Sequence, residues 1–420
     1  MKITVAKWTK MVYNKFGKKH MEKTMEEIKR IYADNAATTP VLPEVVEAML
    51  PCFNELWGNP SSMHADGQAA GEKLAEARAK IAELIGAQPN EIYFTSCGSE
   101  SDNWAIKGAV KMAKAGRNKI VTSKIEHPAV LQTCKALEKD GFEVVYVGVD
   151  EKGILNMDEL SAAIDEKTAI VAVMLANNEI GTIQPIAEVS KLAKAAGAVM
   201  FTDAVQAVGS IAVDVRELGV DMLAFSGHKL GTPKGIGALY IKRGTRIRNL
   251  IDGGGQESGK RGGTENLPYI VGLAKALEIA VEKLPDMERV RALRNRLIDG
   301  LLKIPYSKLN GDREKRLPGN ANVSFEFIEG ESMLLWLDIM GISASTGSAC
   351  SSKSLEPSHV LVATGLPIEM AHGSLRFSLS HQNTEKEVDR IIEVVTDVVA
   401  KLRAMSPLAP DTQNEAVYVK

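Results

Sequence analysis

The feature that most restricts the fold of this chain is an alternation of short apolar runs with helical patterns between Gln68 and Ile241. The apolar runs are nearly continuous, as expected for strands buried on both faces of a parallel sheet. They cover residues 91–95, 119–122, 144–147, 169–176, 198–201, 222–225 and 236–241. Two of the intervening helical patterns end at Gly86 and Gly197. The alternation predicts an α/β domain with a mostly parallel sheet flanked by helices.

The pattern changes after Pro285, and a length of 420 residues favours two domains. The remaining chain predicts helices at 287–302, from 330 and at 385–405, and strands at 320–327 and 374–380. We therefore expect a large domain at 46–285 and a smaller α+β domain built from 31–45 and 286–420. A loop at about 343–356 belongs to the smaller domain.

Charge and composition exclude several classes of protein. Lys and Arg number 51 against 53 Asp and Glu, a net charge of -2, which predicts no general affinity for nucleic acid. No apolar stretch has the roughly 20 residues that a membrane helix needs, so no membrane partner is expected. Residues 1–30 carry nine basic and three acidic residues and predict a poorly ordered basic extension. The four cysteines show no metal or disulfide spacing, which favours the cytoplasm.

Two charged residues follow directly on predicted buried strands, where an unpartnered charge is costly. Asp203 follows the predicted strand at 198–201, and Lys229 follows the next one at 222–225. The two residues are 26 positions apart, the length of one helix-and-strand crossover. Both are therefore expected at the same rim of the sheet, where ligands of open α/β sheets bind. A lysine that forms a Schiff base and an aspartate beside a pyridinium nitrogen are the groups that pyridoxal 5'-phosphate (PLP) requires. An ordinary Asp–Lys ion pair is the alternative.

A turn of small residues at 96–102 follows the first predicted strand and leads into a helix. Ser99 and Asp102 have the spacing of a capping box. A helix start of this kind offers free N–H groups to an anion such as a phosphate.

Seven ordered segments resemble the cysteine desulfurases of the NifS/IscS type, class-V aminotransferases with PLP fold type I. The resemblance extends from about residue 31 to residue 407. The segments are YADNAATTP at 32–40, GNPSS at 58–62, NNEIG at 177–181, SGHK at 226–229, RGGTEN at 261–266, GSAC at 347–350 and RFSL at 376–379.

This resemblance implies a set of cofactor-binding residues. Lys229 is the implied Schiff-base lysine, and Asp203 the partner of the pyridine nitrogen. Gln206 is expected at the phenolic oxygen, and His127 on the ring face, where it also moves a proton. The implied phosphate ligands are Gly98, Ser99, Ser226 and His228. Thr264 is expected to reach the phosphate of a neighbouring subunit, which implies a homodimer.

The resemblance also implies the substrate, L-cysteine, and the route of its sulfur. Asn177 and Arg376 are expected to bind the substrate carboxylate, with Asn35 as a further candidate; Asn177 is also counted among the cofactor ligands. Cys350 lies in a small, polar segment that suits a mobile loop, and is the implied nucleophile that takes the sulfur as a persulfide. L-alanine is the second product, and the sulfur passes to an acceptor protein such as an iron–sulfur scaffold.

Three other functions are the alternatives. An aminotransferase, or a lyase acting on selenocysteine or cysteine sulfinate, needs the same cofactor site without depending on Cys350. A silent scaffold for sulfur-transfer partners has no need of Lys229, Asp203, Gln206 and His127. A second thiol, Cys97, stands beside the predicted phosphate turn, and we interpret it as a tolerated small residue.

Overall fold

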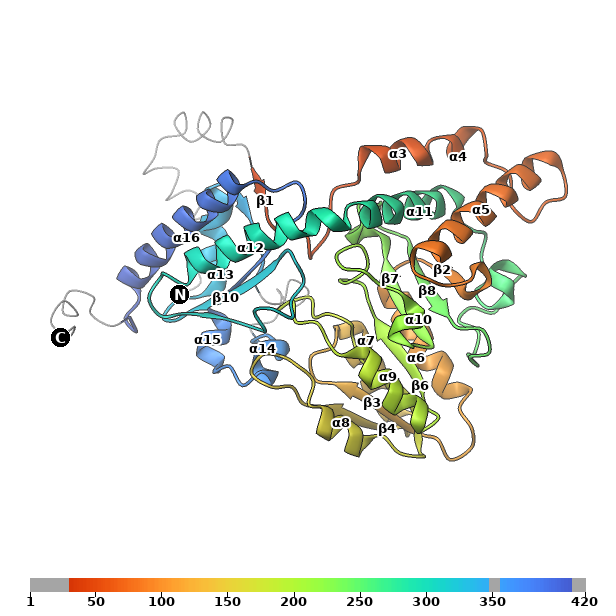
Figure 1. Ribbon diagram of the computed structural model, residues 1–420, viewed down its shortest axis with the longest axis horizontal. Helices are drawn as coiled ribbons and strands as arrows, with labels where there is room; N and C mark the ends of the chain where they lie inside the picture. Colours follow the sequence, from red (N-terminus) through yellow and green to blue (C-terminus); the bar gives the residue numbers. More distant parts are fainter. Residues whose placement is uncertain (1–29, 347–355, 410–420) are drawn as a thin grey trace.

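A seven-stranded sheet forms the centre of the larger part of the molecule (Figure 1). The computed structural model describes residues 30–346 and 356–409. The strand order is β2-β8-β7-β6-β5-β3-β4, and only β8 runs antiparallel to its neighbours. The strands are β2 (Ile92–Thr95), β3 (Lys119–Ser123), β4 (Glu143–Val147), β5 (Thr168–Ala172), β6 (Val199–Asp203), β7 (Met222–Ser226) and β8 (Gly237–Ile241). The sheet predicted from the apolar runs is confirmed.

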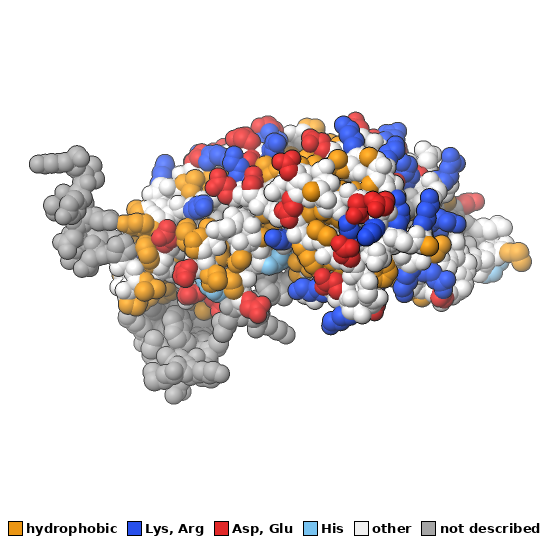
Figure 2. Space-filling model, turned by 90° about the horizontal axis from the view of Figure 1, so that it is seen from below, with side chains coloured by type: hydrophobic (Ala, Val, Ile, Leu, Met, Phe, Trp, Pro, Cys, Tyr) orange, Lys and Arg blue, Asp and Glu red, His pale blue; other side chains and the backbone are white. Residues whose placement is uncertain are grey.

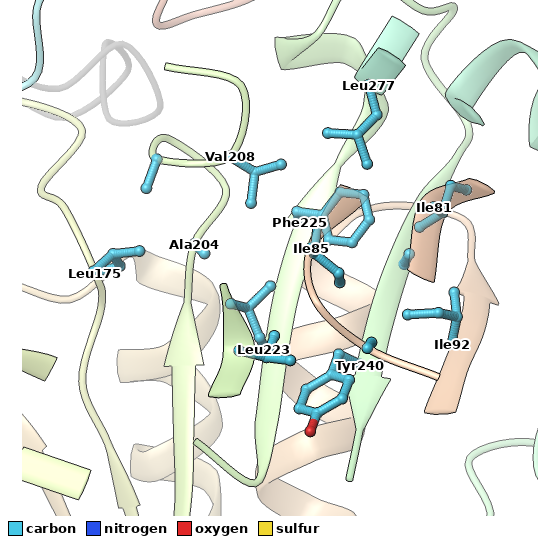
Figure 3. Packing of buried hydrophobic residues seen from close by; sticks show 14 of the residues in the cluster. Ile81, Ile85, Ile92, Leu175, Ala204, Val208, Leu223, Phe225, Tyr240 and Leu277 are labelled. Atoms are coloured by element: carbon cyan, nitrogen blue, oxygen red, sulfur yellow. The ribbon is translucent and has the colours of Figure 1, made fainter. Parts of the chain in front are cut away.

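Helices cover both faces of this sheet, and the pleat of β7 shows how. Leu223 and Phe225 pack into the cluster under α5, α9 and α11, whereas Met222 and Ala224 face the cluster with α6 and α7. Figure 3 shows Phe225 and Leu223 beside side chains from α5 and α11. The helices are α3 (Pro43–Met49), α4 (Pro51–Asn54), α5 (Ala65–Leu84), α6 (Gly98–Lys111), α7 (Pro128–Lys139), α8 (Met157–Ala163), α9 (Ile186–Ala195), α10 (Val215–Leu218) and α11 (Leu267–Glu282). Short 3-10 turns lie at η1 (Pro89–Glu91), η2 (Gly227–Lys229), η3 (Gln256–Gly259) and η4 (Leu284–Asp286).

A second, smaller layer of sheet and helices has a hydrophobic core of its own, which contains Phe325, Phe377 and Val395. Its antiparallel sheet has the order β12-β10-β9, and β1 pairs in parallel with β11. The strands are β1 (Ile31–Tyr32), β9 (Ser307–Leu309), β10 (Asn320–Phe325), β11 (Ile342–Ser343) and β12 (Ser374–Ser378). The helices are α12 (Met287–Leu301), α13 (Gly330–Ile339), α14 (His359–Ala363), α15 (Ile368–His372) and α16 (Glu385–Met405).

The two parts are joined along α11 and α12, which follow one another across the molecule with η4 between them (Figure 1). The chain between β1 and α3 runs back from the smaller part to the larger one. Basic and acidic side chains are interspersed over the face drawn in Figure 2, with apolar patches between them. Among the described residues, no helix is both long and apolar enough to cross a membrane.

Candidate active site

A cavity of about 310 Å³ lies where the carboxyl ends of β6 and β7 meet the first turns of α6 and α7. This is the edge of the sheet at which the sequence predicts a ligand site. The predicted residues that line it are Gly98, Ser99, His127, Asp203, Gln206, Ser226, His228, Lys229 and Arg376. These side chains come from both parts of the molecule, because Arg376 lies on β12.

Asp203 and Lys229 are brought to one cavity by the parallel pairing of β6 and β7, in which Asp203 is in register with Ala224. The Asp203 carboxylate accepts from the Val205 N–H at 2.9 Å. Burial raises the pKa of Asp203, and the nearby His127 and Lys229 oppose that rise. The Lys229 amine donates to the carbonyls of Ala36 and Ala37 at 2.6 and 2.8 Å. The two charges that PLP requires therefore share one cavity.

His127 is the N-cap of α7, and this role fixes which ring nitrogen carries the proton. Its Nδ1 accepts from the Ala129 N–H at 3.1 Å. Burial lowers the pKa of His127, so the neutral ring predominates. A neutral ring that accepts at Nδ1 carries its hydrogen on Nε2. His127 thus offers one N–H donor for proton transfer.

A set of donors suited to a phosphate surrounds the first turn of α6. The N–H groups of a first helical turn have no acceptor within the helix. The Ser226 hydroxyl is 2% exposed and has no hydrogen-bond partner among the described residues. His228 Nδ1 lies 3.1 Å from the Thr38 hydroxyl, and burial lowers the pKa of His228 to about 4. A Cβ on Gly98 would lie 2.8 Å from the Val205 side chain, so only glycine leaves this approach open.

The predicted capping box at this turn is wrong. The helix begins at Gly98 with Cys97 as its N-cap, and no side chain caps it. Ser99 is therefore already inside the helix, and Asp102 is 1% exposed with Oδ1 unpartnered among the described residues. Glu100 turns back instead and accepts from the Ser96 N–H at 3.0 Å.

These residues fit PLP. The unpartnered Ser226 hydroxyl and the α6 start suit its phosphate, the Asp203 carboxylate suits its pyridine nitrogen, and the Lys229 amine suits its aldehyde. Gln206 lines the same cavity and donates to the Ala36 carbonyl at 3.0 Å.

Arg376 supplies a guanidinium to the cavity wall. It is 2% exposed and forms an ion pair with Asp34 at 3.0 Å. A second N–H group donates to the Asn178 carbonyl at 3.0 Å, while Nε has no partner among the described residues. A carboxylate ligand therefore finds both a charge and an unused donor here.

The structure does not bring every predicted residue into the cavity. The Asn177 amide is fully buried and donates to the Ile125 carbonyl, and Asn178 lines the cavity instead. Asn35 lines an adjoining cavity, where its amide donates to the Ser378 carbonyl. Thr264 lines a separate hollow and is exposed. Cys350 lies outside the described residues.

Four acidic residues at or near the cavity were missed by the sequence reasoning: Asp34, Asp102, Glu126 and Glu179. Burial raises the pKa of Glu126 to about 8 and that of Glu179 to about 7. Asp34 and Glu179 lie inside recognised segments, beside Asn35 and Asn178, and Glu126 stands next to His127; these neighbours were the available signal. Cys97 also lines the cavity, whereas Cys52 and Cys134 are buried.

Comparison with known proteins agrees with this geometry. A family model described as aminotransferase class-V matches residues 31–391. A cysteine desulfurase IscS from Methanosarcina thermophila is 55% identical over 393 residues, which are 93% of this chain and 96% of that protein. One from Clostridium botulinum is 51% identical over 91% of this chain and 98% of its own length.

Solved structures show the same likeness. A structure named NifS-like protein has a TM-score of 0.84 and 41% identity, and the match covers 89% of this chain and all of that one. A structure named SspA in complex with cysteine has a TM-score of 0.73 and 36% identity, covering 85% of this chain and all of the other. The agreement extends over both parts of the fold.

Proposed function

Because the chain belongs to the class-V aminotransferase family, whose members use PLP, we propose that it is a cysteine desulfurase that converts L-cysteine into L-alanine and a protein-bound persulfide. The observation that carries the proposal is the convergence of Lys229, Asp203 and Arg376 on one cavity. The high identity to proteins named cysteine desulfurase supports it over nearly the whole chain.

Bound PLP supplies an electron sink for the substrate's Cα. Lys229 anchors the cofactor and, once released by the substrate, moves the proton at Cα. Asp203 would keep the pyridine nitrogen protonated, because an ionised carboxylate beside that nitrogen favours its charged form. Arg376 would orient the substrate through its carboxylate, and the Nε2–H of His127 would act as a proton donor in the site.

We assign the sulfur-accepting step to Cys350, which stands in the GSAC segment outside the described residues. Its thiolate attacks the substrate sulfur and forms an S–S bond. The Cβ–S bond of the substrate breaks with its electron pair moving to carbon, and protonation there gives L-alanine. A thiolate of an acceptor protein, such as an iron–sulfur scaffold, then takes the outer sulfur and restores Cys350.

The assay that tests the function measures L-alanine and sulfide together after L-cysteine and a reductant are added to the purified holoenzyme. A desulfurase produces both in equal amounts, and Cys350→Ser abolishes both. If the Cys350→Ser variant still formed L-alanine and sulfide in equal amounts, the result would favour a lyase. Appearance of a keto acid without sulfide would favour an aminotransferase.

We propose a homodimer in which each subunit completes the other's site. Four apolar residues between α3 and the chain just after α4, Val46, Leu50, Phe53 and Trp57, are each 44% to 67% exposed. Helices α3 and α4 lie at the outer edge of the molecule (Figure 1), and a second copy is the occupant we propose for these apolar side chains. Thr264, exposed and outside its own subunit's cavity, is free to contact a partner's phosphate.

Sedimentation tests this assembly. We expect Phe53→Glu with Trp57→Glu to yield monomers without activity, whereas Met405→Glu, at an equally exposed site on α16, leaves the dimer intact. Mixed dimers of Lys229→Ala and Thr264→Val subunits should regain activity at one of their two sites. Dimers that survive the double substitution would place the interface elsewhere.

We also retain the two domains expected from the sequence, 46–285 and 31–45 with 286–420. The separate hydrophobic cores support two domains, and Leu42 and Val45 pack into the core of the larger one. We propose a cytoplasmic location, since Cys52, Cys97 and Cys134 are unpaired and the reaction itself needs reduced thiols.

A further inference from the structure

Glu179 is a buried acid that the proposed reaction has not used. It lies in the NNEIG segment, lines the cavity with Arg376 and is 2% exposed. Its backbone carbonyl accepts from the side-chain amides of Asn320 and Asn322 on β10, at 3.2 and 3.1 Å. Glu179 is therefore held on the boundary between the two sheets by contacts that leave its carboxylate available.

The carboxylate of Glu179 accepts a hydrogen bond from the Ser358 hydroxyl. Ser358 is 7% exposed and is the N-cap of α14, where it also accepts from the Leu361 N–H at 3.2 Å. Ser358 stands eight residues after Cys350, and the undescribed segment 347–355 ends three residues before it. The carboxylate thus holds a residue close to the point where the described chain resumes after Cys350.

Two further contacts fix α14 at the same place. The His359 ring nitrogen Nε2 lies 3.0 Å from the Glu126 carbonyl, and a carbonyl only accepts, so His359 is the donor. Val360 and Leu361 are fully buried in a small apolar cluster with Ile125 and Ile180. The Glu179–Ser358 hydrogen bond is therefore shielded from water. Losing a buried hydrogen bond costs more free energy than losing one at the surface.

The residues that precede the undescribed segment are attached to β12, the strand that carries Arg376. The backbones of Ser345 and Arg376 exchange two hydrogen bonds, at 3.1 and 2.7 Å. The Ser345 hydroxyl also lies 3.2 Å from Asp34, the ion-pair partner of Arg376. Both flanks of the Cys350 segment are thus fastened beside the side chain that we expect to bind the substrate carboxylate.

We propose that Glu179 is a positioning residue for sulfur transfer: by holding Ser358, it fixes one end of the Cys350 segment to the wall of the substrate cavity. The proposal rests on the desulfurase function above. It predicts that losing this contact slows capture of the sulfur and leaves the earlier chemistry at Cα unchanged.

Ser358 is the residue to vary, because Glu179 lines the cavity and Ser358 does not. Ser358→Ala removes both the donor and the helix cap. Ser358→Asp keeps a good cap but places a second carboxylate against Glu179. Ser358→Thr keeps the cap and the donor. The three variants therefore separate the Glu179 contact from capping of α14.

Three measurements are compared for each variant. The first is L-alanine formation from L-cysteine by the holoenzyme, and the second is exchange of the Cα hydrogen of L-alanine in D2O, which needs Lys229 but not Cys350. The third is the rate at which iodoacetamide alkylates Cys350 in the cofactor-free protein, followed by peptide mass spectrometry. The third readout is independent of activity.

We expect Ser358→Ala and Ser358→Asp to lose about tenfold in L-alanine formation, the loss of one hydrogen bond to a charged group. The rate of Cα-hydrogen exchange in both variants should stay within about twofold of that of the parent, and the rate of Cys350 alkylation should change. Ser358→Thr should resemble the parent in all three measurements. A parent-like Ser358→Asp beside an impaired Ser358→Ala would reduce Ser358 to a helix cap and overturn the proposal. Equal losses in formation and exchange would also overturn it. A parent enzyme inactive on L-cysteine would refute the desulfurase function alone, because the alkylation rates still report the contact.

Discussion

Replacing Ser226 by alanine separates cofactor binding from folding, because the hydroxyl of Ser226 has no partner in the part of the protein that the structure describes. The side chain is 2% exposed, and its oxygen finds no hydrogen bond among the described residues. Folding of the cofactor-free chain therefore desolvates this hydroxyl without compensation. A bound phosphate at the start of α6 would supply the missing acceptor.

Ser226→Ala should affect the stability of the cofactor-free protein and its affinity for PLP very differently. In the cofactor-free protein, Ser226→Ala removes an uncompensated buried group, so the free energy of unfolding should fall by less than about 1 kcal/mol, or rise. In the holoenzyme it removes a hydrogen bond to a charged ligand worth about 1.5–3 kcal/mol. The dissociation constant of PLP should therefore rise about ten- to a hundredfold.

Ser101 provides the matched control. Ser101 lies on α6, is fully buried and does not line the cavity. Its hydroxyl is hydrogen-bonded to the Thr95 hydroxyl at 2.8 Å and to the Ala238 carbonyl at 3.2 Å. Ser101→Ala should cost about 1–3 kcal/mol of stability and leave PLP affinity unchanged. Denaturant unfolding of the cofactor-free proteins and PLP titration by absorbance measure both quantities. A destabilised Ser226→Ala protein with parent-like PLP affinity would refute the phosphate assignment.

Three further predictions concern single residues. Cys350→Ser should form almost no L-alanine, whereas Cys97→Ala should keep most activity; the reverse result would exchange the roles of the two thiols. Asp203→Asn should slow Cα-hydrogen exchange by at least about a hundredfold with PLP still bound, because an amide cannot keep the pyridine nitrogen protonated, and an unchanged exchange rate would count against this role. Burial lowers the pKa of His228 from 6.5 to about 4. His228 therefore binds a proton more readily in the unfolded chain than in the folded protein. The stability contributed by neutral His228 is present above pH 6.5 and is lost as the pH falls toward 4. His228→Gln should flatten this part of the unfolding profile, and parallel profiles would disprove it.

Much of the fold was predictable because parallel strands buried on both faces need continuous apolar runs. The run at 222–225 became β7 with one residue added, and the helical pattern ending at Gly86 became α5. Gly86 adopts a φ of 75°, a conformation that favours glycine and that stops the helix. The antiparallel direction of β8 was not predictable, since a continuous apolar run carries no sign of strand direction.

Within the site, the residues that follow strands directly were predictable, because the end of a strand fixes their place. Asp203 and Lys229 needed only the crossover length between them. Side chains committed to distant backbone groups were not predictable. The Asn177 amide is taken up by the Ile125 carbonyl, 52 positions away, and Asp34 meets Arg376 across 342 positions.

The sequence by itself determined the α/β architecture, the strand ends that carry Asp203 and Lys229, and the family to which the chain belongs. These follow from local periodicity and from residues that stand next to one another in the chain. Only the tertiary structure decided that the Ser226 hydroxyl is buried without a partner among the described residues, that Asp34 pairs with Arg376, and that Glu179 holds Ser358. Such contacts depend on how separate elements pack, and the energy of a buried polar group is set by the partner that packing brings to it.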